Sequence, residues 1–323
     1  MTTAVFLTID TEFAWRHHRA GLGADAIYDR SLEPAGVGIT YQLAKLADHA
    51  LKACFFVDPM PALAFGIEPI RRMVGTILDA GQEVQLHLHP AWATAIPRDR
   101  GANHAKFDLS DYSYAEQHDL IVRATELLVA AGAPMPIAFR AGSYAANDDT
   151  LAALAALGFA YDSSHNGSLA AGASRISLPA YQISPIRAPV TGDAALIELP
   201  VTVIEDSPGR LRTLQLCALS ANESRNALEH AGAAGHVAVT IVSHSFELAN
   251  RGGARANAVH VRRFDALCAT LAAVREEMPT VHFADRPVLE LGRADRPLGQ
   301  NPIRRGWRHA EQLWSNWVEE RAG

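Results

Sequence analysis

Short apolar runs alternate with longer segments of helical periodicity along most of the chain. The runs are rich in β-branched and aromatic residues, which is typical of buried strands. They occupy residues 4–9, 53–57, 83–88, 137–140, 159–163, 196–204, 237–244 and 280–284. Between them, apolar residues recur at helical spacing in segments 38–50, 67–80, 115–132, 148–158, 220–232 and 256–278. The pattern predicts a series of strand–helix units.

Strands that alternate with helices predict a parallel sheet, because parallel strands need a long crossover connection. The sheet could be an open, doubly wound one or a closed (β/α) barrel. No GxGxxG follows the first strand and no GxxxxGK[ST] is present, so the nucleotide-binding open sheets lose their main support. The number of units and the distribution of polar residues favour a distorted (β/α) barrel of seven or eight parallel strands over residues 1–285.

The last part of the chain has a different pattern. Residues 286–323 are rich in arginine and tryptophan, and Trp307, Ala310, Trp314 and Trp317 recur at helical spacing. A helix with one apolar face packs on a core or binds a partner. Packing against the barrel is the favoured interpretation, so this segment is predicted to be a helical extension packed on the barrel.

Composition and charge exclude several classes of protein. The 323 residues are 49% hydrophobic and 20% charged, as in ordinary globular enzymes. The net charge of −6 gives no electrostatic basis for binding nucleic acid. The three cysteines form no CxxC pair, which argues against a disulfide framework or a cysteine zinc site. No apolar run is long enough to span a membrane and no signal peptide is recognisable, so we expect a cytoplasmic protein.

Polar residues follow most of the predicted strands. In a (β/α) barrel the carboxyl ends of the strands meet at one mouth, where active sites are built. The residues expected there are Asp10, Glu12, Asp58, His87, His89, Arg140, Tyr144, Asp162, His244, Glu247 and Asp285. Carboxylates, imidazoles and an arginine at one mouth indicate a metal-assisted hydrolase.

Two pairs of these residues could share a metal ion. His87 and His89 are separated by one residue, so both imidazoles point to the same side of a strand. Asp10 and Glu12 have the same spacing, and two carboxylates at the end of a buried strand are costly without a cation. The alternatives are a buried, hydrogen-bonded histidine and a carboxylate that caps a helix or pairs with Arg16. The sequence favours metal binding for both pairs.

Arg140 and His244 each end an apolar strand. A buried guanidinium needs a carboxylate partner, so Arg140 either orients a catalytic carboxylate or forms a structural ion pair with Asp148 or Asp149. His244 is placed to face the mouth as a proton carrier. A buried core histidine is the other interpretation of His244.

The segment 91–114 is long for a connection between a strand and a helix. Long loops in compact domains often cover or bind a ligand. Trp92 and Tyr112 are expected either to stack on a sugar ring or to pack the loop on the surface. Trp92 is therefore a candidate substrate contact.

Four segments, each at a predicted strand end, resemble the motifs of one enzyme family in the same order. TIDTE (8–12) is similar to a first motif that usually reads TFDDG, and EVQLHLHP (83–90) to a histidine motif. FRAGSY (139–144) is similar to an arginine motif that usually reads RxPY, and IVSHSFE (241–247) to a last histidine motif. The family is that of the polysaccharide deacetylases, also called NodB-homology proteins or carbohydrate esterase family 4. The resemblance covers residues 4–285.

The motifs depart from the usual family pattern at three places. Thr11 stands at the second aspartate of TFDDG, which leaves Glu12 as the second carboxylate. His87 and His89 are separated by one residue instead of three, and Arg140 is followed by Ala-Gly-Ser instead of a turn with proline. The resemblance then implies that Glu12, His87 and His89 hold a divalent metal, expected to be zinc.

The resemblance also implies a reaction, the removal of an acetyl group from an N-acetylated sugar or glycan precursor. Asp10, held by Arg140, would take the proton of the attacking water. A backbone N–H near Ser143 or Tyr144 would help to stabilise the oxyanion. His244 would give a proton to the leaving amine.

The resemblance adds one more candidate substrate contact and leaves other functions open. GFAYDSS (158–164) is similar to the segment that follows the arginine motif in some members, so Asp162 is expected to line the cleft with Trp92, Ser143 and Tyr144. One other function is hydrolysis of a non-sugar C–N bond, in a ureide ring or a formyl amide. Another is carbohydrate binding without catalysis. The sequence leaves the oligomeric state open.

Overall fold

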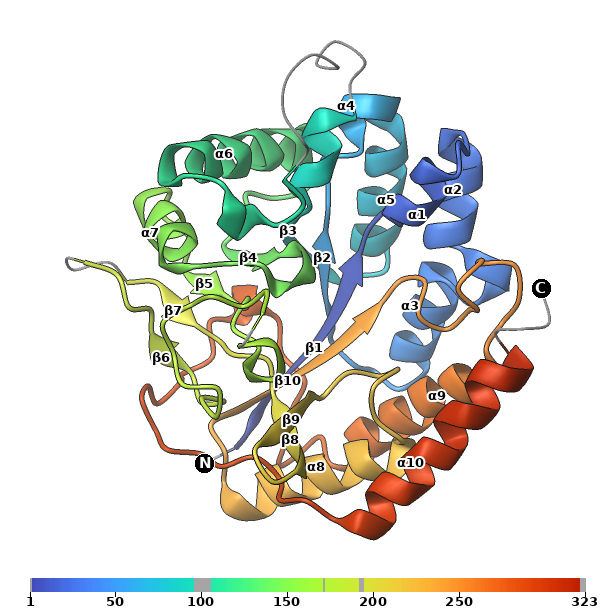
Figure 1. Ribbon diagram of the computed structural model, residues 1–323, viewed down its shortest axis with the longest axis vertical. Helices are drawn as coiled ribbons and strands as arrows, with labels where there is room; N and C mark the ends of the chain where they lie inside the picture. Colours follow the sequence, from blue (N-terminus) through green and yellow to red (C-terminus); the bar gives the residue numbers. More distant parts are fainter. Residues whose placement is uncertain (1, 96–105, 171, 192–194, 320–323) are drawn as a thin grey trace.

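A curled sheet of eight strands forms the centre of the molecule (Figure 1). The computed structural model describes residues 2–95, 106–170, 172–191 and 195–319. In spatial order the strands are β10 (Ala238–His244), β1 (Ala4–Thr11), β2 (Cys54–Val57), β3 (Glu83–Leu88), β4 (Ala138–Ala141), β5 (Tyr161–Asp162), β7 (Ile197–Glu198) and β6 (Ile186–Arg187). The seven strands from β10 to β7 are parallel, and β6 is antiparallel to β7. The sheet is thus the distorted (β/α) barrel that the sequence predicts.

The barrel closes irregularly beside β10. β8 (Val203–Ser207) and β9 (Arg210–Thr213) form a separate antiparallel hairpin. Directly after this hairpin, the backbone N–H of Val242 in β10 donates to the carbonyl of Leu214 (3.0 Å), and the N–H of Leu216 donates to the carbonyl of Val242 (3.0 Å). This short ladder covers the edge of β10 that a regular barrel would pair with another strand.

The predicted strand 196–204 is wrong in its length. The structure divides this segment between β7, which ends at Glu198, and β8, which begins at Val203. Pro200 lies between them and has no N–H to give to a ladder. The apolar run therefore serves two strands of different sheets.

The last predicted strand, 280–284, makes only one parallel bridge, from Thr280 to Val5 at the start of β1. Further along, β2 occupies this edge of β1, so the strand cannot continue. The carboxylate of Asp285 pairs with Nζ of Lys52 (2.8 Å), which precedes β2. Asp285 therefore lies at the amino ends of the strands, and its expected position at the mouth is wrong.

Helices cover the outer face of the sheet (Figure 1). The longer ones are α3 (Ile39–Asp48), α5 (Glu68–Asp79), α6 (Tyr114–Ala130), α7 (Asp148–Ala156), α8 (Ala221–Ala234) and α9 (Ala258–Ala273). The short helices α1 (Trp15–Arg19), α2 (Ala24–Ser31) and α4 (Ala62–Phe65) follow β1 and β2. Ser220 and Glu223 form the predicted capping box of α8. Among the described residues, none of the helices combines the length and apolarity that a membrane crossing requires.

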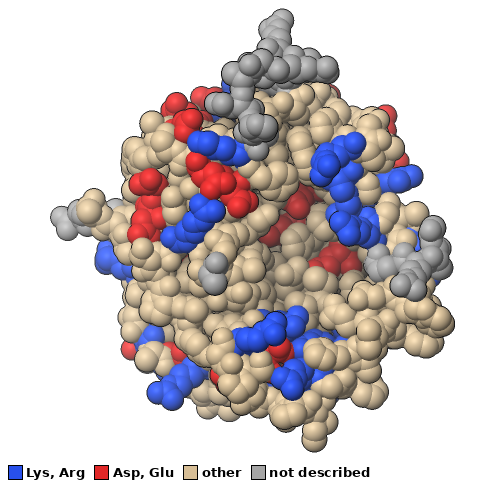
Figure 2. Space-filling view, in the orientation of Figure 1, with Lys and Arg blue, Asp and Glu red and all other residues tan. Residues whose placement is uncertain are grey.

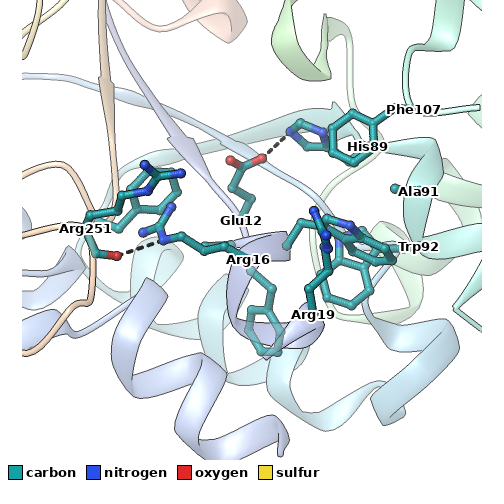
Figure 3. Close-up of a pocket in the computed structure, with 12 residues that line it drawn as sticks. Glu12, Arg16, Arg19, His89, Ala91, Trp92, Phe107 and Arg251 are labelled. Atoms are coloured by element: carbon teal, nitrogen blue, oxygen red, sulfur yellow. Dashed lines mark hydrogen bonds and ion pairs between the residues drawn. The ribbon is translucent and has the colours of Figure 1, made fainter. Parts of the chain in front are cut away.

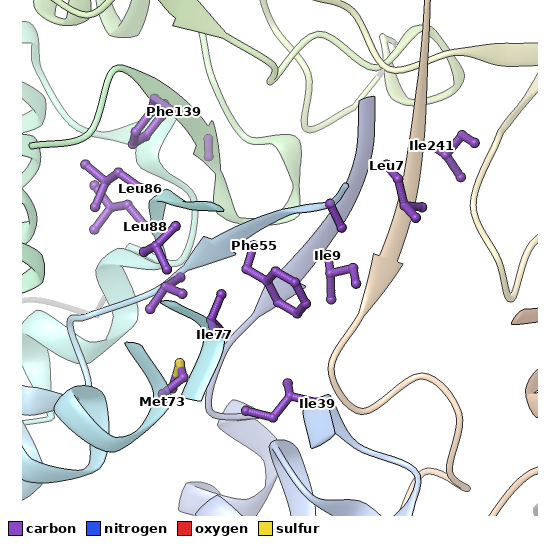
Figure 4. Packing of buried hydrophobic residues seen from close by; sticks show 14 of the residues in the cluster. Leu7, Ile9, Ile39, Phe55, Met73, Ile77, Leu86, Leu88, Phe139 and Ile241 are labelled. Carbon is purple, nitrogen blue, oxygen red and sulfur yellow. The ribbon is translucent and has the colours of Figure 1, made fainter. Parts of the chain in front are cut away.

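The outward-facing side chains of the strands form the main hydrophobic core. Leu7 and Ile9 of β1 and Phe55 of β2 belong to one buried cluster with Ile39 of α3 and Ile77 of α5 (Figure 4). Complete burial of one such side chain stabilises the fold by about 1.5–3 kcal/mol. The helical spacing in the sequence therefore gives the face of each helix that meets the sheet.

The inner face of the barrel changes from aromatic to polar along the strands. Near the amino ends, the ring of Phe283 lies 4.8 Å from that of Phe6 and 5.6 Å from that of Phe56, centroid to centroid. Side chains alternate along a strand, so Phe6 is followed on the same face by Thr8 and Asp10. The aromatic rings thus close the barrel below, and the polar side chains gather at the carboxyl ends.

The C-terminal helix α10 (Pro302–Trp314) lies on the barrel by its charged side. Arg308 is 1% exposed and pairs with Glu223 of α8 (Nη1 to Oε1, 2.7 Å) and with Asp206 of β8. The exposed fractions of the tryptophans are 63% for Trp307, 57% for Trp314 and 66% for Trp317. The expected packing of these tryptophans on the barrel is therefore wrong, because the buried face of α10 is the charged one.

Candidate active site

The carboxyl ends of five neighbouring strands bring the predicted polar residues together. Asp10 at the end of β1 stands opposite His244 at the end of β10. His87 in β3 stands opposite Arg140 in β4. Because these positions continue the inner face of the barrel, their side chains meet above the aromatic rings.

Glu12, His87 and His89 form a cluster that could hold a metal ion. One carboxylate oxygen of Glu12 and one ring nitrogen of each histidine all lie within 4.8 Å of one another. Oε2 of Glu12 is 3.3 Å from Nε2 of His87 and also contacts Nε2 of His89. Burial works against the charged carboxylate of Glu12, but the charge and close contact of His89 and His87 keep its pKa well below the ordinary value.

The surroundings of the cluster fit a cation. Oε2 of Glu12 is buried and accepts no well-formed hydrogen bond from the described residues. Nδ1 of His87 donates to the backbone carbonyl of Arg140 (2.8 Å), which leaves the lone pair of Nε2 directed at Glu12. Metal-binding histidines commonly have such a second hydrogen bond. Two imidazole nitrogens and a carboxylate oxygen are ligands that suit a catalytic zinc ion.

Gly142, which the sequence reasoning did not select, positions His89. A Cβ atom at residue 142 would overlap the imidazole ring of His89. Any larger residue there would push the ring away from Glu12. The sequence signal was a glycine directly after a buried strand, which often marks a close approach of the backbone.

Arg140 holds Asp10 through a buried ion pair. Nη1 of Arg140 lies 2.7 Å from Oδ1 of Asp10 and also donates to Oγ1 of Thr8 (2.8 Å). Nε and Nη2 donate to the carbonyl and the hydroxyl of Ser163 (3.1 and 3.0 Å). The guanidinium carbon lies 4.4 Å from the ring centroid of Phe56. These contacts leave Arg140 one orientation.

The alternative ion pair of Arg140 with Asp148 or Asp149 does not form. Oδ1 of Asp148 accepts a hydrogen bond from the backbone N–H of Ser177 (2.9 Å), and Asp149 is exposed. Both residues begin α7, where a carboxylate interacts well with the helix dipole. Asp10 is thus the carboxylate that Arg140 orients.

His244 lies between two carboxylates. Its Nε2 is 3.9 Å from Oδ2 of Asp10, and its Nδ1 is 3.8 Å from Oε1 of Glu247. Burial disfavours the charged imidazolium, but the close contact and charge of Glu247 and the charge of Asp10 outweigh it and raise the pKa of His244 to about 9. Despite its burial, Glu247 has its pKa lowered to about 2, mainly by His244. His244 is therefore protonated at neutral pH.

Asp58 adds a third carboxyl group near the cluster. It is fully buried, and its Oδ1 accepts the backbone N–H of Met60 (3.0 Å). Its Oδ2 accepts no hydrogen bond from the described residues. Burial raises the pKa of Asp58 to about 7, although the charges of His89 and His87 favour the carboxylate. The sequence predicts Asp58 at the mouth and assigns it no role.

The turn after β4 places Ser143 and Tyr144 beside the site. Both residues have left-handed backbone angles, with φ of 56° and 57°. Such angles are uncommon outside glycine and cluster at functional sites. Ser143 is exposed, whereas Tyr144 is buried and its hydroxyl has no hydrogen-bond partner among the described residues.

Asp162 does not line the cleft, contrary to expectation. It is 0% exposed, and its two oxygens accept hydrogen bonds from the hydroxyl and the backbone N–H of Ser164 (2.7 and 3.1 Å). It stands opposite Glu198 in β7, and burial raises the pKa of both carboxyl groups. Asp162 therefore supports the segment that holds Arg140 instead of contacting a substrate.

A cavity of about 310 Å³ opens beside Glu12 and His89 (Figure 3). Trp92 lines it but is only 1% exposed, because it packs among other aromatic rings. Phe107, which the sequence reasoning did not select, lines the same cavity and is 46% exposed. Trp92 thus shapes the wall, and Phe107 presents the more open ring. Residues 96–105 of the predicted loop lie outside the described ranges.

Comparisons with known proteins give matches among solved structures. No protein-family model matches the chain, and no curated protein is significantly similar in sequence. A candidate polysaccharide deacetylase from Mycobacterium smegmatis is 19% identical, with a TM-score of 0.55 over 91% of this chain and 95% of that chain. The Puue allantoinase is 11% identical, with a TM-score of 0.55 over 88% of each chain. A family 4 carbohydrate esterase from Streptomyces lividans is 14% identical, with a TM-score of 0.44 over 91% of this chain and 98% of that chain.

At sequence identities this low, the structural similarity establishes the fold and leaves the activity open. The two structures with the higher TM-scores cover 91% and 88% of the chain. The chain therefore has the distorted (β/α) barrel fold of the polysaccharide deacetylases.

Proposed function

We propose that this protein is a metal-dependent hydrolase that removes an acetyl group from an N-acetylated sugar or glycan precursor. The observation that carries the proposal is the position of two proton-carrying groups beside one possible metal site. Asp10 and His244 face each other across β1 and β10 (3.9 Å), next to the cluster formed by Glu12, His87 and His89. Hydrolysis of an amide needs a base for the water and an acid for the amine.

Each group of the chain has a separate task in this reaction. Glu12, His87 and His89 would hold a divalent ion such as zinc, which would supply Lewis acidity for the amide carbonyl and the water. Asp10 accepts the proton of the water, and Arg140 keeps the carboxylate in place. His244, which is protonated at neutral pH, donates a proton to the nitrogen that leaves. The products are acetate and a free amine.

A second candidate function keeps the site and changes the substrate. The allantoinase structure has the same TM-score as the candidate deacetylase. A cyclic ureide presents a C–N bond to the same base, acid and cation. A panel of N-acetylated sugars and cyclic ureides distinguishes the two, because turnover of only one class assigns the substrate.

Gly142 gives a test of the metal site. We expect the wild-type protein to bind one zinc ion, and Gly142→Ala to lower the affinity by about 10–100-fold, since the methyl group displaces His89. Gly75→Ala in α5 is the matched control, because a Cβ there meets nothing within 4 Å. Titration against a chromophoric chelator measures both. Equal affinity of the Gly142 variant and the wild type would contradict the assignment of His89.

We expect replacement of Asp10 to impair turnover and replacement of Glu12 to impair zinc binding. Asp10→Asn should retain zinc and lose turnover by about 10²–10⁴-fold, because an amide cannot accept the proton. Glu12→Gln should lower zinc affinity, with activity partly recovered at high zinc. Metal analysis and turnover of the same preparations separate the two effects. If Asp10→Asn loses zinc while Glu12→Gln keeps it, the roles are reversed.

The pKa of His244 predicts the alkaline limit of activity. The protonated imidazole is the active form, so kcat/KM should fall as the pH rises through about 9. Glu247→Gln removes the charge that raises this pKa, so the alkaline limb should move to lower pH. His118→Ala, in α6, should leave the profile unchanged. If the alkaline limb of kcat/KM stays at the same pH in Glu247→Gln, another group determines that limb.

A further inference from the structure

Arginine side chains line the cavity beside Glu12, with Arg16 and Arg251 side by side and Arg19 apart from them, next to Trp92 (Figure 3). Arg16, Arg19 and Arg251 line this cavity, and Glu12 is the single acidic residue among the described residues that line it. Figure 2 shows red atoms at the floor of a central hollow and blue atoms along one rim, where α1 lies in Figure 1. The charge of this wall is opposite to the net charge of the chain, which is −6.

The fold holds Arg16 in place. Its Nε donates to the backbone carbonyl of Arg251 (2.8 Å), and its guanidinium carbon lies 4.8 Å from the ring centroid of Phe246. A guanidinium fixed in this way loses little freedom when it binds an anion. Arg16 therefore keeps a fixed position on the cavity wall.

Arg19 is exposed at the end of α1, a helix whose last turn is entirely basic. No carboxylate in the described part of the chain lies within ion-pair distance of Arg19. Its charge is thus not neutralised by a carboxylate of the described residues.

Arg16 and Arg251 lie between the cavity at Glu12 and a cavity at His244. A second cavity, of about 590 Å³, is lined by His244 and shares Arg16, Phe246 and Arg251 with the first. A substrate that reaches both Glu12 and His244 therefore passes these guanidinium groups.

We propose that the substrate carries a phosphate or carboxylate group near its acyl amide, and that Arg16, Arg19 and Arg251 bind this group. The proposal rests on the proposed hydrolase function and adds the charge of its substrate. An anion at this wall forms charge-assisted hydrogen bonds, which a neutral sugar cannot form. The aromatic rings of the cavity can pack against the sugar itself.

The test compares charged and neutral substrates in three variants. The substrates are N-acetylglucosamine, its 1- and 6-phosphates, and N-acetylmuramic acid, which carries a carboxylate. We expect kcat/KM of at least one charged sugar to exceed that of the neutral sugar by about tenfold or more. Arg19→Gln and Arg251→Gln should each reduce this ratio, whereas Arg123→Gln in α6 should preserve it. Comparison of the two sugar phosphates with N-acetylmuramic acid shows whether the site binds phosphate or carboxylate.

Equal kcat/KM for charged and neutral sugars would overturn the proposal, as would a ratio that the two arginine variants leave unchanged. Binding of inorganic phosphate, measured by calorimetry on the same four proteins, does not depend on turnover. Weaker binding in the two arginine variants alone supports the anion site, and equal binding overturns it. If no N-acetylated sugar is turned over, the proposed function fails separately, and phosphate binding decides the anion site.

A different observation concerns the outer face of α10. Its exposed side carries Ile303, Trp307, Ala310, Leu313 and Trp314, and Trp317 follows in the π-helical turn Ser315–Glu319. The exposed fraction of Ile303 is 84% and that of Leu313 is 71%. The helix turns its charged side inward, where Arg263 of α9 pairs with Glu311 (2.9 Å). An amphipathic helix normally has the opposite orientation.

The spacing of this stripe suits another helix. Within α10, positions 303, 307, 310 and 314 follow alternate steps of four and three residues, which is the seam of a coiled coil. Read in the opposite direction about Ala310, Trp307 and Trp314 nearly exchange places, so two antiparallel α10 helices can pack symmetrically. The side chains expose on the order of 700 Å², close to the ~800 Å² that each partner buries in a stable complex.

We infer that this stripe joins two copies of the chain through their α10 helices. Sedimentation over a range of concentrations tests this, with a dimer expected for the wild type. Trp307→Glu combined with Trp314→Glu should give a monomer, whereas Met135→Glu should not, although Met135 is also 66% exposed. A monomeric wild type at 100 μM or above would overturn the inference. A monomer that binds phosphatidylglycerol vesicles through the stripe would instead assign this face to a membrane surface.

Discussion

The buried ion pair between Arg140 and Asp10 is the interaction on which the rest of the site depends. The two side chains are 0% and 2% exposed. Removal of one partner of such a pair leaves an uncompensated buried charge and costs about 3–5 kcal/mol. The same guanidinium binds Thr8 and Ser163, so it ties β1, β4 and the segment after β5 together. Any change at Arg140 therefore moves both the proposed base and the walls of the mouth.

The ion pair also determines which carboxylate oxygen of Asp10 faces His244. Oδ1 of Asp10 is held by Arg140, which leaves Oδ2 on the side of His244. Below them, the rings of Phe6 and Phe56 close the interior of the barrel. The polar groups therefore meet only at the carboxyl ends of the strands. Asp10 and Glu247 lie on either side of His244, while a different carboxylate, that of Glu12, belongs to the cluster with His87 and His89.

Local periodicity accounts for what the sequence could predict. The spacing of His87 and His89 places both imidazoles on one side because strand side chains alternate. Contacts between distant segments were not predictable, such as the close approach of Gly142 to His89. Asp162 was misplaced because its burial depends on β7, which is remote in sequence. The orientation of α10 was also misjudged, since the ion pairs of Arg308 outweigh the usual preference for burying the apolar face.

The central claim is that Glu12, His87 and His89 hold the metal ion of a hydrolase. X-ray absorption at the zinc edge, on the purified wild-type protein, tests it most directly. The account predicts one zinc ion with two imidazole nitrogens and at least one carboxylate oxygen at about 2.0–2.2 Å, without sulfur. A zinc ion bound through sulfur, or without any imidazole ligand, would contradict it.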